Sequence, residues 1–192
     1  MDRISIRYNM RRHRPRGQSV VEFALVVPLL LLVLIAIADF GRFYTSAVAV
    51  ESAAREAADF GAFDASNWTP ANASTTTGLM QQRACVAAAG SHLEGYQSSD
   101  PNNNTCTNPT FACTLELGAQ AADCATSNGM VGTSDCSQPT TDPPCTVHVA
   151  LTYQFRTLLA LPPMPSNVQV VRDSRFWVSN LTPASPAPSA SP

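Results

Sequence analysis

The chain has 192 residues, a formal net charge of −2 and 14% charged residues, where an average soluble domain has about 25%. This length suits one modest domain, and the near-neutral balance argues against a nucleic-acid-binding protein, which usually carries a basic surplus. Because 45% of the residues are hydrophobic, an apolar segment must concentrate part of them.

The N-terminal region has a basic leader followed by an apolar run. All twelve basic residues are Arg, and six of them lie at or before residue 16. In Val20–Ala38, 17 of 19 residues are apolar, the exceptions being Glu22 and Pro28. As a helix this run would be roughly 28 Å long, close to the hydrocarbon thickness of a bilayer. The Arg bias predicts a cytoplasmic N-terminus and sends the residues after about 39 outward.

The helical pattern continues beyond the apolar run. Apolar or small residues recur at steps of three and four and predict one buried stripe, formed by Phe40, Phe43, Ala47, Val50, Ala54, Ala57 and Gly61. Polar residues occupy the opposite side, namely Arg42, Thr45, Ser52, Glu56 and Asp59. We therefore expect one helix over 18–60, whose first half is transmembrane and whose second half supports an outer domain.

Two processing schemes compete at this end. Ala36-Ile37-Ala38 would suit a secretory signal cut before Asp39. Against it, a disposable signal has no reason to carry the cost of Glu22 inside its apolar run. A basic leader that ends at Gly17, with Glu22 five residues beyond, instead resembles the type IV prepilin signal, which is cut after the Gly. That cut would leave an ammonium at Gln18, and a neighbouring subunit's ammonium could pair with a buried Glu22. In an ordinary anchor, Glu22 would be an interfacial residue.

A longer resemblance covers residues 16–60. Residues 16–30, the stretch Asp39–Arg42 and the stretch Ala53–Ala58 resemble the corresponding parts of TadE-like proteins, the pseudopilins of tight-adherence (Flp) pilus systems. A looser similarity covers 145–178. The resemblance implies a single-pass inner-membrane protein that a prepilin peptidase processes. Its partners would be other pilins or pseudopilins and the Tad secretion machinery, with Glu22 as the assembly carboxylate.

The cysteines lie only in the outer part. There are six, an even number confined to one region, which predicts disulfides in an oxidising compartment; they are Cys85, Cys106, Cys113, Cys124, Cys136 and Cys145. Zinc sites need close pairs, but the shortest gap here holds six residues, so we expect no metal. The connectivity stays open, because six cysteines allow 15 pairings.

The sequence after the long helix predicts a small α+β domain over 61–180. We expect a break over 61–78, a short helix over 79–93 with Met80, Ala84 and His92 on one side, and loops over 98–110 and 126–146. Alternation predicts strands over 147–155 and 167–178, paired antiparallel and packed on the outer half of the long helix. Cys113–Leu117 adds a short strand. Residues 181–192 are rich in Pro, Ala and Ser and predict a disordered tail.

No catalytic pattern is found in the sequence. It has no phosphate-binding loop, no HExxH and no GxSxG motif. Acidic residues of the outer part are scattered singly, and His148 falls on the polar side of a strand, where a solvated histidine is expected. We expect no enzyme, cofactor, nucleic acid or small-molecule substrate. The alternatives to a pilus component are an anchored adhesive or binding protein and a secreted soluble protein.

Overall fold

A computed structural model describes residues 18–102, 104–138, 143–158 and 165–179. The predicted leader 1–17 and tail 181–192 lie outside these residues. The chain divides into two compact units, with the boundary between Ala38 and Asp39. Each unit is described by itself below.

One continuous helix, α1, extends from Gln18 to Ala62, two residues beyond the predicted end. It continues through Pro28, which lacks the amide hydrogen of a regular helical residue. It also continues across the unit boundary, so the alternative signal site at Ala36–Ala38 lies within regular helix.

The second half of α1 buries the predicted stripe from Phe43 onward. Val50, Ala54 and Ala57 are fully buried, and small side chains here let the helix lie close to the sheet. Phe40 was assigned to this stripe wrongly, since its side chain is 69% exposed. Phe155 is in edge contact with Phe43 on this side of α1.

A short connection leads to the second helix. The 3₁₀ helix η1 (Ala65–Trp68) is capped by the Asp64 carboxylate, and α2 covers Ala73–Gly90. The indole of Trp68 is fully buried and donates to the Gly61 carbonyl at 2.8 Å. The predicted helix began too late, because buried contacts of Ala73 and Thr76 outweigh the low helix propensity of this Thr-rich stretch. His92 lies beyond α2, at φ +52°, and the prediction that it faces the core with Met80 is wrong.

The sheet has four antiparallel strands in the order β4-β3-β7-β8. Their bounds are Thr110–Leu117 for β3, Gln120–Asp123 for β4, Thr146–Arg156 for β7 and Asn167–Trp177 for β8. In the central register, Val149 of β7 lies opposite Cys113 and Ser174. The two predicted long strands and their antiparallel pairing are thus confirmed.

Two small ribbons occupy segments that were predicted as loops. Strands β1 (Gln97–Ser98) and β2 (Cys106–Asn108) pair antiparallel, as do β5 (Met130–Val131) and β6 (Ser134–Asp135). Their residues give no apolar alternation, because side-chain hydrogen bonds hold the turns. The Asp100 carboxylate, for example, accepts the backbone N–H groups of Asn102, Asn104 and Thr105.

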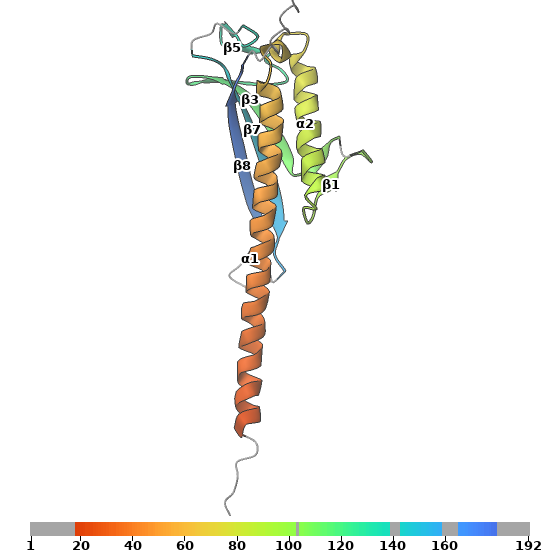
Figure 1. Cartoon of the computed structure of the whole chain (residues 1–192), viewed down its shortest axis with the longest axis vertical. Helices are drawn as coiled ribbons and strands as arrows, with labels where there is room; N and C mark the ends of the chain where they lie inside the picture. The colour runs from red at the N-terminus through yellow and green to blue at the C-terminus, as the bar shows by residue number, and fades with distance from the viewer. Residues whose placement is uncertain (1–17, 103, 139–142, 159–164, 180–192) are drawn as a thin grey trace, which may run out of the picture. The chain divides into compact units, whose positions relative to one another are not determined.

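The core lies between the helices and one face of the sheet. Strand β7 contributes its buried alternate residues, Val147, Val149, Leu151, Tyr153 and Phe155. Figure 1 shows α1 and α2 beside each other against the strands, and the guanidinium of Arg83 on α2 lies 4.3 Å from the Phe60 ring centroid on α1. The predicted α+β class, with a long helix packed on a small antiparallel sheet, is confirmed.

Three disulfides join these elements. Cys85–Cys106 connects α2 to β2, Cys113–Cys124 connects β3 to the residue after β4, and Cys136–Cys145 connects the β6 side to the start of β7. No cysteine is free. The sequence separations are 21, 11 and 9 residues, and closing loops of this size stabilises a fold by about 3 kcal/mol each in the chain-entropy model.

The backbone at Gly129 should tolerate no side chain, which gives a testable prediction. Its φ is +79°, and a Cβ built on it would overlap the backbone carbonyl of Trp68. Gly129→Ala should therefore displace the β5 ribbon from η1 and lower the melting temperature strongly, measured by circular dichroism. Gly118→Ala is the control, since φ is +60° but nothing lies within 4 Å, leaving a cost of about 1–2 kcal/mol. Equal losses for both variants would contradict the predicted overlap.

Candidate functional site

The first candidate is the apolar first half of α1. By length and composition, α1 is the one helix among the described residues that could cross a membrane, and none of its most apolar stretch is buried. The large apolar side chains of residues 20–37 are 37–74% exposed, apart from Val27, whose exposure is intermediate. A surface of this kind is far more apolar than soluble proteins expose, so this segment requires lipid or another protein.

The predicted processing residues lie at the start of this segment. Gly17 is outside the described residues, and Gln18 is the first residue of α1. Glu22 is on the exposed surface of α1, one turn beyond Gln18. A carboxylate at this place, in a segment otherwise made of apolar residues, would be costly in hydrocarbon unless it is paired.

At the other end of the apolar run, charged residues hold α1 to the sheet. The Asp39 carboxylate accepts from Arg42 Nη1 at 3.2 Å and from the backbone N–H of Leu158 at 3.2 and 3.3 Å. The second terminal nitrogen of Arg42 forms an ion pair with Glu94, and its guanidinium lies 5.6 Å from the Phe155 ring centroid. We call Asp39, Arg42, Glu94, Phe155 and Leu158 the Asp39 clasp.

Tyr153 extends the clasp into the core. Its hydroxyl donates to the backbone carbonyl of Glu94. Burial raises the pKa of Tyr153, although a hydrogen bond with Ser46 and the charge of Arg42 act in the opposite direction. The clasp thus joins α1, the segment after α2 and the end of β7, and its contacts serve a structural role.

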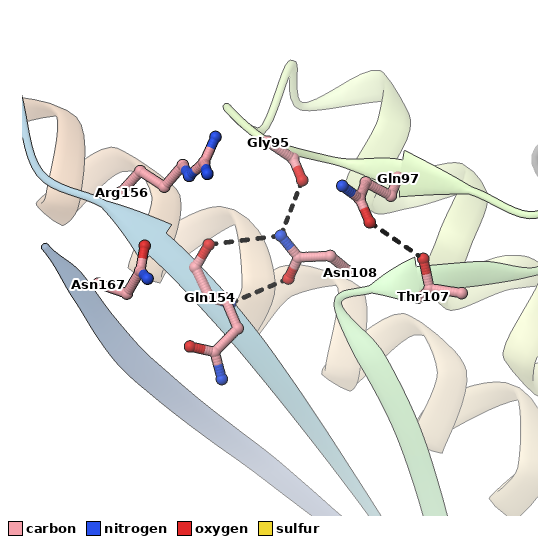
Figure 2. Close-up of a pocket in the computed structure, with 7 residues that line it drawn as sticks. All are labelled: Gly95, Gln97, Thr107, Asn108, Gln154, Arg156 and Asn167. Carbon is pink, nitrogen blue, oxygen red and sulfur yellow. Dashed lines mark hydrogen bonds between the residues drawn. The ribbon is translucent and has the colours of Figure 1, made fainter.

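A polar cavity of about 340 Å³ lies beside the end of β7. Figure 2 shows its lining, formed by Gly95, Gln97, Thr107, Asn108, Gln154, Arg156 and Asn167. Asn108 binds the backbone on both sides: its amide nitrogen donates to Gly95 O at 2.7 Å, and its oxygen accepts from Gln154 N at 2.9 Å. Asn108 therefore connects β2 to β7 structurally, while Arg156 gives the cavity its one cationic lining residue.

The face of the sheet away from the core carries a charge cluster that sequence reasoning missed. Glu116 Oε1 lies 2.7 Å from Nδ1 of His148, and Asp173 Oδ2 lies 3.3 Å from its Nε2. Arg175 contacts both carboxylates, at 3.2 and 2.9 Å. The expectation of a solvated His148 and of singly scattered acids is therefore wrong, because the register places β3, β7 and β8 residues side by side.

The described residues contain no group of three or more His, Cys, Asp or Glu able to hold a metal ion. Every cysteine is in a disulfide, so thiol chemistry has no nucleophile in the folded chain. The geometry that stands out is an uncovered apolar helical segment with one acid, followed by the cross-linked unit that begins at Asp39, which we call the outer unit after its place in the sequence-based prediction.

Comparison with known proteins gives one match. A model of the TadE-like protein family matches residues 17–59, which confirms the resemblance inferred from the sequence. The match covers the apolar segment and most of the rest of α1, and it does not extend to the looser similarity over 145–178. It implies a Tad pilus-associated role, membrane association and pilus or secretion partners. No match was found among the curated proteins or the solved structures.

The Asp39 clasp predicts a stability contribution. Asp39→Ala removes the acceptor of two donors and should lower the free energy of unfolding by about 1–3 kcal/mol, measured by thermal unfolding of the full chain in detergent. Asp39→Asn keeps an oxygen for Leu158 and should lose less. The matched control is Glu51→Ala, whose partner Arg55 is exposed, and whose loss should stay below about 1 kcal/mol. Equal losses for Asp39→Ala and Glu51→Ala would contradict a special role for the clasp.

Proposed function

We propose that this chain is a minor pseudopilin that helps to assemble a Tad (Flp) pilus or a related secretion apparatus through its apolar helix. One observation carries the proposal. The segment that the TadE-like model matches includes large apolar side chains left uncovered by the rest of the described chain. In a bilayer, such helices associate by close packing and polar pairing.

Glu22 has a defined part in this proposal. Cleavage after Gly17 by a prepilin peptidase would create an ammonium on Gln18. A carboxylate inside a helix assembly is stable only when it is paired, and the new ammonium of a neighbouring copy or pilin is a cation of the right charge. Glu22 would thus set the axial register between subunits rather than perform chemistry.

The proposed orientation places the outer unit outside the cytoplasm. The Arg-rich leader would stay in the cytoplasm, and the three disulfides suit an oxidising compartment. The rival interpretation is an anchored adhesive or binding protein that never joins an assembly. It shares the anchor and the orientation, so the two proposals differ in the mature N-terminus and in the role of Glu22.

The mature N-terminus gives the first test. Mass spectrometry of the protein from its native membrane should find Gln18 as the first residue. Gly17→Val should block this cleavage, because it replaces the Gly after which the prepilin-like signal would be cut. A start at Met1 would favour the anchored adhesive protein, and a start at Asp39 would favour a secreted soluble protein; either result would remove the prepilin proposal.

Substitution of Glu22 gives the second test. Glu22→Ala should leave membrane insertion intact, since it makes the segment more apolar, and should reduce surface pili by tenfold or more. The matched control is Glu56→Ala on the exposed side of the same helix, where the ion pair with Arg83 is long, at 4.0 Å. Counting pili by electron microscopy, with fractionation to confirm insertion, separates the cases. Normal piliation by Glu22→Ala would refute the assembly role.

A further inference from the structure

The connection between β7 and β8 meets α1 where the apolar segment ends. Asp39 is the first residue after that segment, and its carboxylate accepts the backbone N–H of Leu158 at 3.2 and 3.3 Å. Leu158 comes two residues after the end of β7. The clasp therefore ties one end of the sheet to the residue at which the lipid-compatible part of α1 stops.

Apolar side chains at this end of the outer unit are uncovered. Leu158 is 57% exposed, Phe40 69% and Tyr44 62%. Large apolar side chains that gather on a surface mark a site of contact with a partner or a membrane, so this end needs an environment other than bulk water.

The charged side chains beside Leu158 already pair with one another. The side chains of Asp39 and Arg42 are only 18% and 27% exposed and contact each other, and Arg42 also pairs with Glu94. These ion pairs within the outer unit thus offset much of the free energy needed to remove water from the charged groups. Placing them close to lipid headgroups adds less cost than burying free charges.

We propose that Leu158, Phe40 and Tyr44 form a membrane-contacting patch that lies in the headgroup layer of the bilayer that α1 crosses. This inference rests on the membrane insertion assumed in the proposed function. Along a helix, Phe40 lies about 3 Å and Tyr44 about 9 Å beyond Ala38. The headgroup layer is about 5–8 Å deep on each side of the hydrocarbon, so Phe40 lies within it and Tyr44 at its outer margin. Aromatic side chains favour this layer.

The patch would give the outer unit a second membrane contact. A single helix leaves a domain free to tilt and rotate above the bilayer. A contact at the end of the sheet, held to α1 by the Asp39 clasp, opposes both motions and fixes which face of the outer unit a partner in the membrane meets. The patch thus deepens the proposed function by setting the orientation of the assembling subunit.

A spin label at residue 158 tests the proposal. All six cysteines are in disulfides, so Leu158→Cys supplies a single reactive thiol and leaves its backbone N–H in place. The labelled full chain is reconstituted into vesicles of phosphatidylethanolamine and phosphatidylglycerol. Collision with lipid-soluble oxygen should exceed collision with a water-soluble nickel chelate at this site. Thr133→Cys is the control and should favour the chelate, because Thr133 is exposed between β5 and β6. Figure 1 shows β5 at the end of the sheet away from the end of β7.

The outcomes separate this proposal from the function on which it rests. Failure of the protein to float with the vesicles would refute membrane insertion and, with it, both proposals. Flotation with a water-accessible label at 158, equal to that at 133, would overturn the membrane-contacting patch alone. In the supporting outcome, the double variant Phe40→Ser with Tyr44→Ser should make the label at 158 more accessible to the chelate, while flotation stays unchanged.

Discussion

The packing of one face of α1 against β7 is the constraint on which the outer unit depends. Alanine and valine side chains on that face are fully buried, and β7 supplies alternating apolar residues opposite them. Small side chains bring helix and strand close together, so a bulky residue at Ala54 or Ala57 would separate the layers. The disulfides add stability around this contact. The other strands of the sheet lie on the two sides of β7, in the order β4-β3-β7-β8.

The same helix satisfies two different requirements in its two halves. In its first half, every side has apolar residues and none is covered by the described chain. In its second half, one face is buried and the other carries Arg55, Glu56 and Asp59. The change from the first pattern to the second occurs at Asp39, where a carboxylate binds both a helical Arg and the end of β7. A single residue thus closes the apolar segment and begins the packed unit.

The sequence predicted the parts whose signal is periodic, and it missed the parts that depend on distant contacts. The long helix and strands β7 and β8 follow from spacing alone. The early start of α2 depends on burial of Ala73 and Thr76. The short strands β1, β2, β5 and β6 depend on turn hydrogen bonds and nearby disulfides, so no apolar alternation in the sequence predicts them. The strand register brings the cluster around His148 together. The clasp around Asp39 instead joins α1 to residues up to 119 positions away, which no local pattern predicts. Gly17 remains a prediction, because it lies outside the described residues.

The return of β8 to the end of α1 has a practical consequence. Ser179 donates its backbone N–H to the carbonyl of Ala62 at 3.0 Å, and its own carbonyl accepts from Ala65 at 3.1 Å. At Ser179 the chain therefore lies beside the last turn of α1, held by backbone hydrogen bonds at both its N–H and its carbonyl. A truncation before Ser179 would remove both bonds and leave the carbonyl of Ala62 and the N–H of Ala65 without these partners.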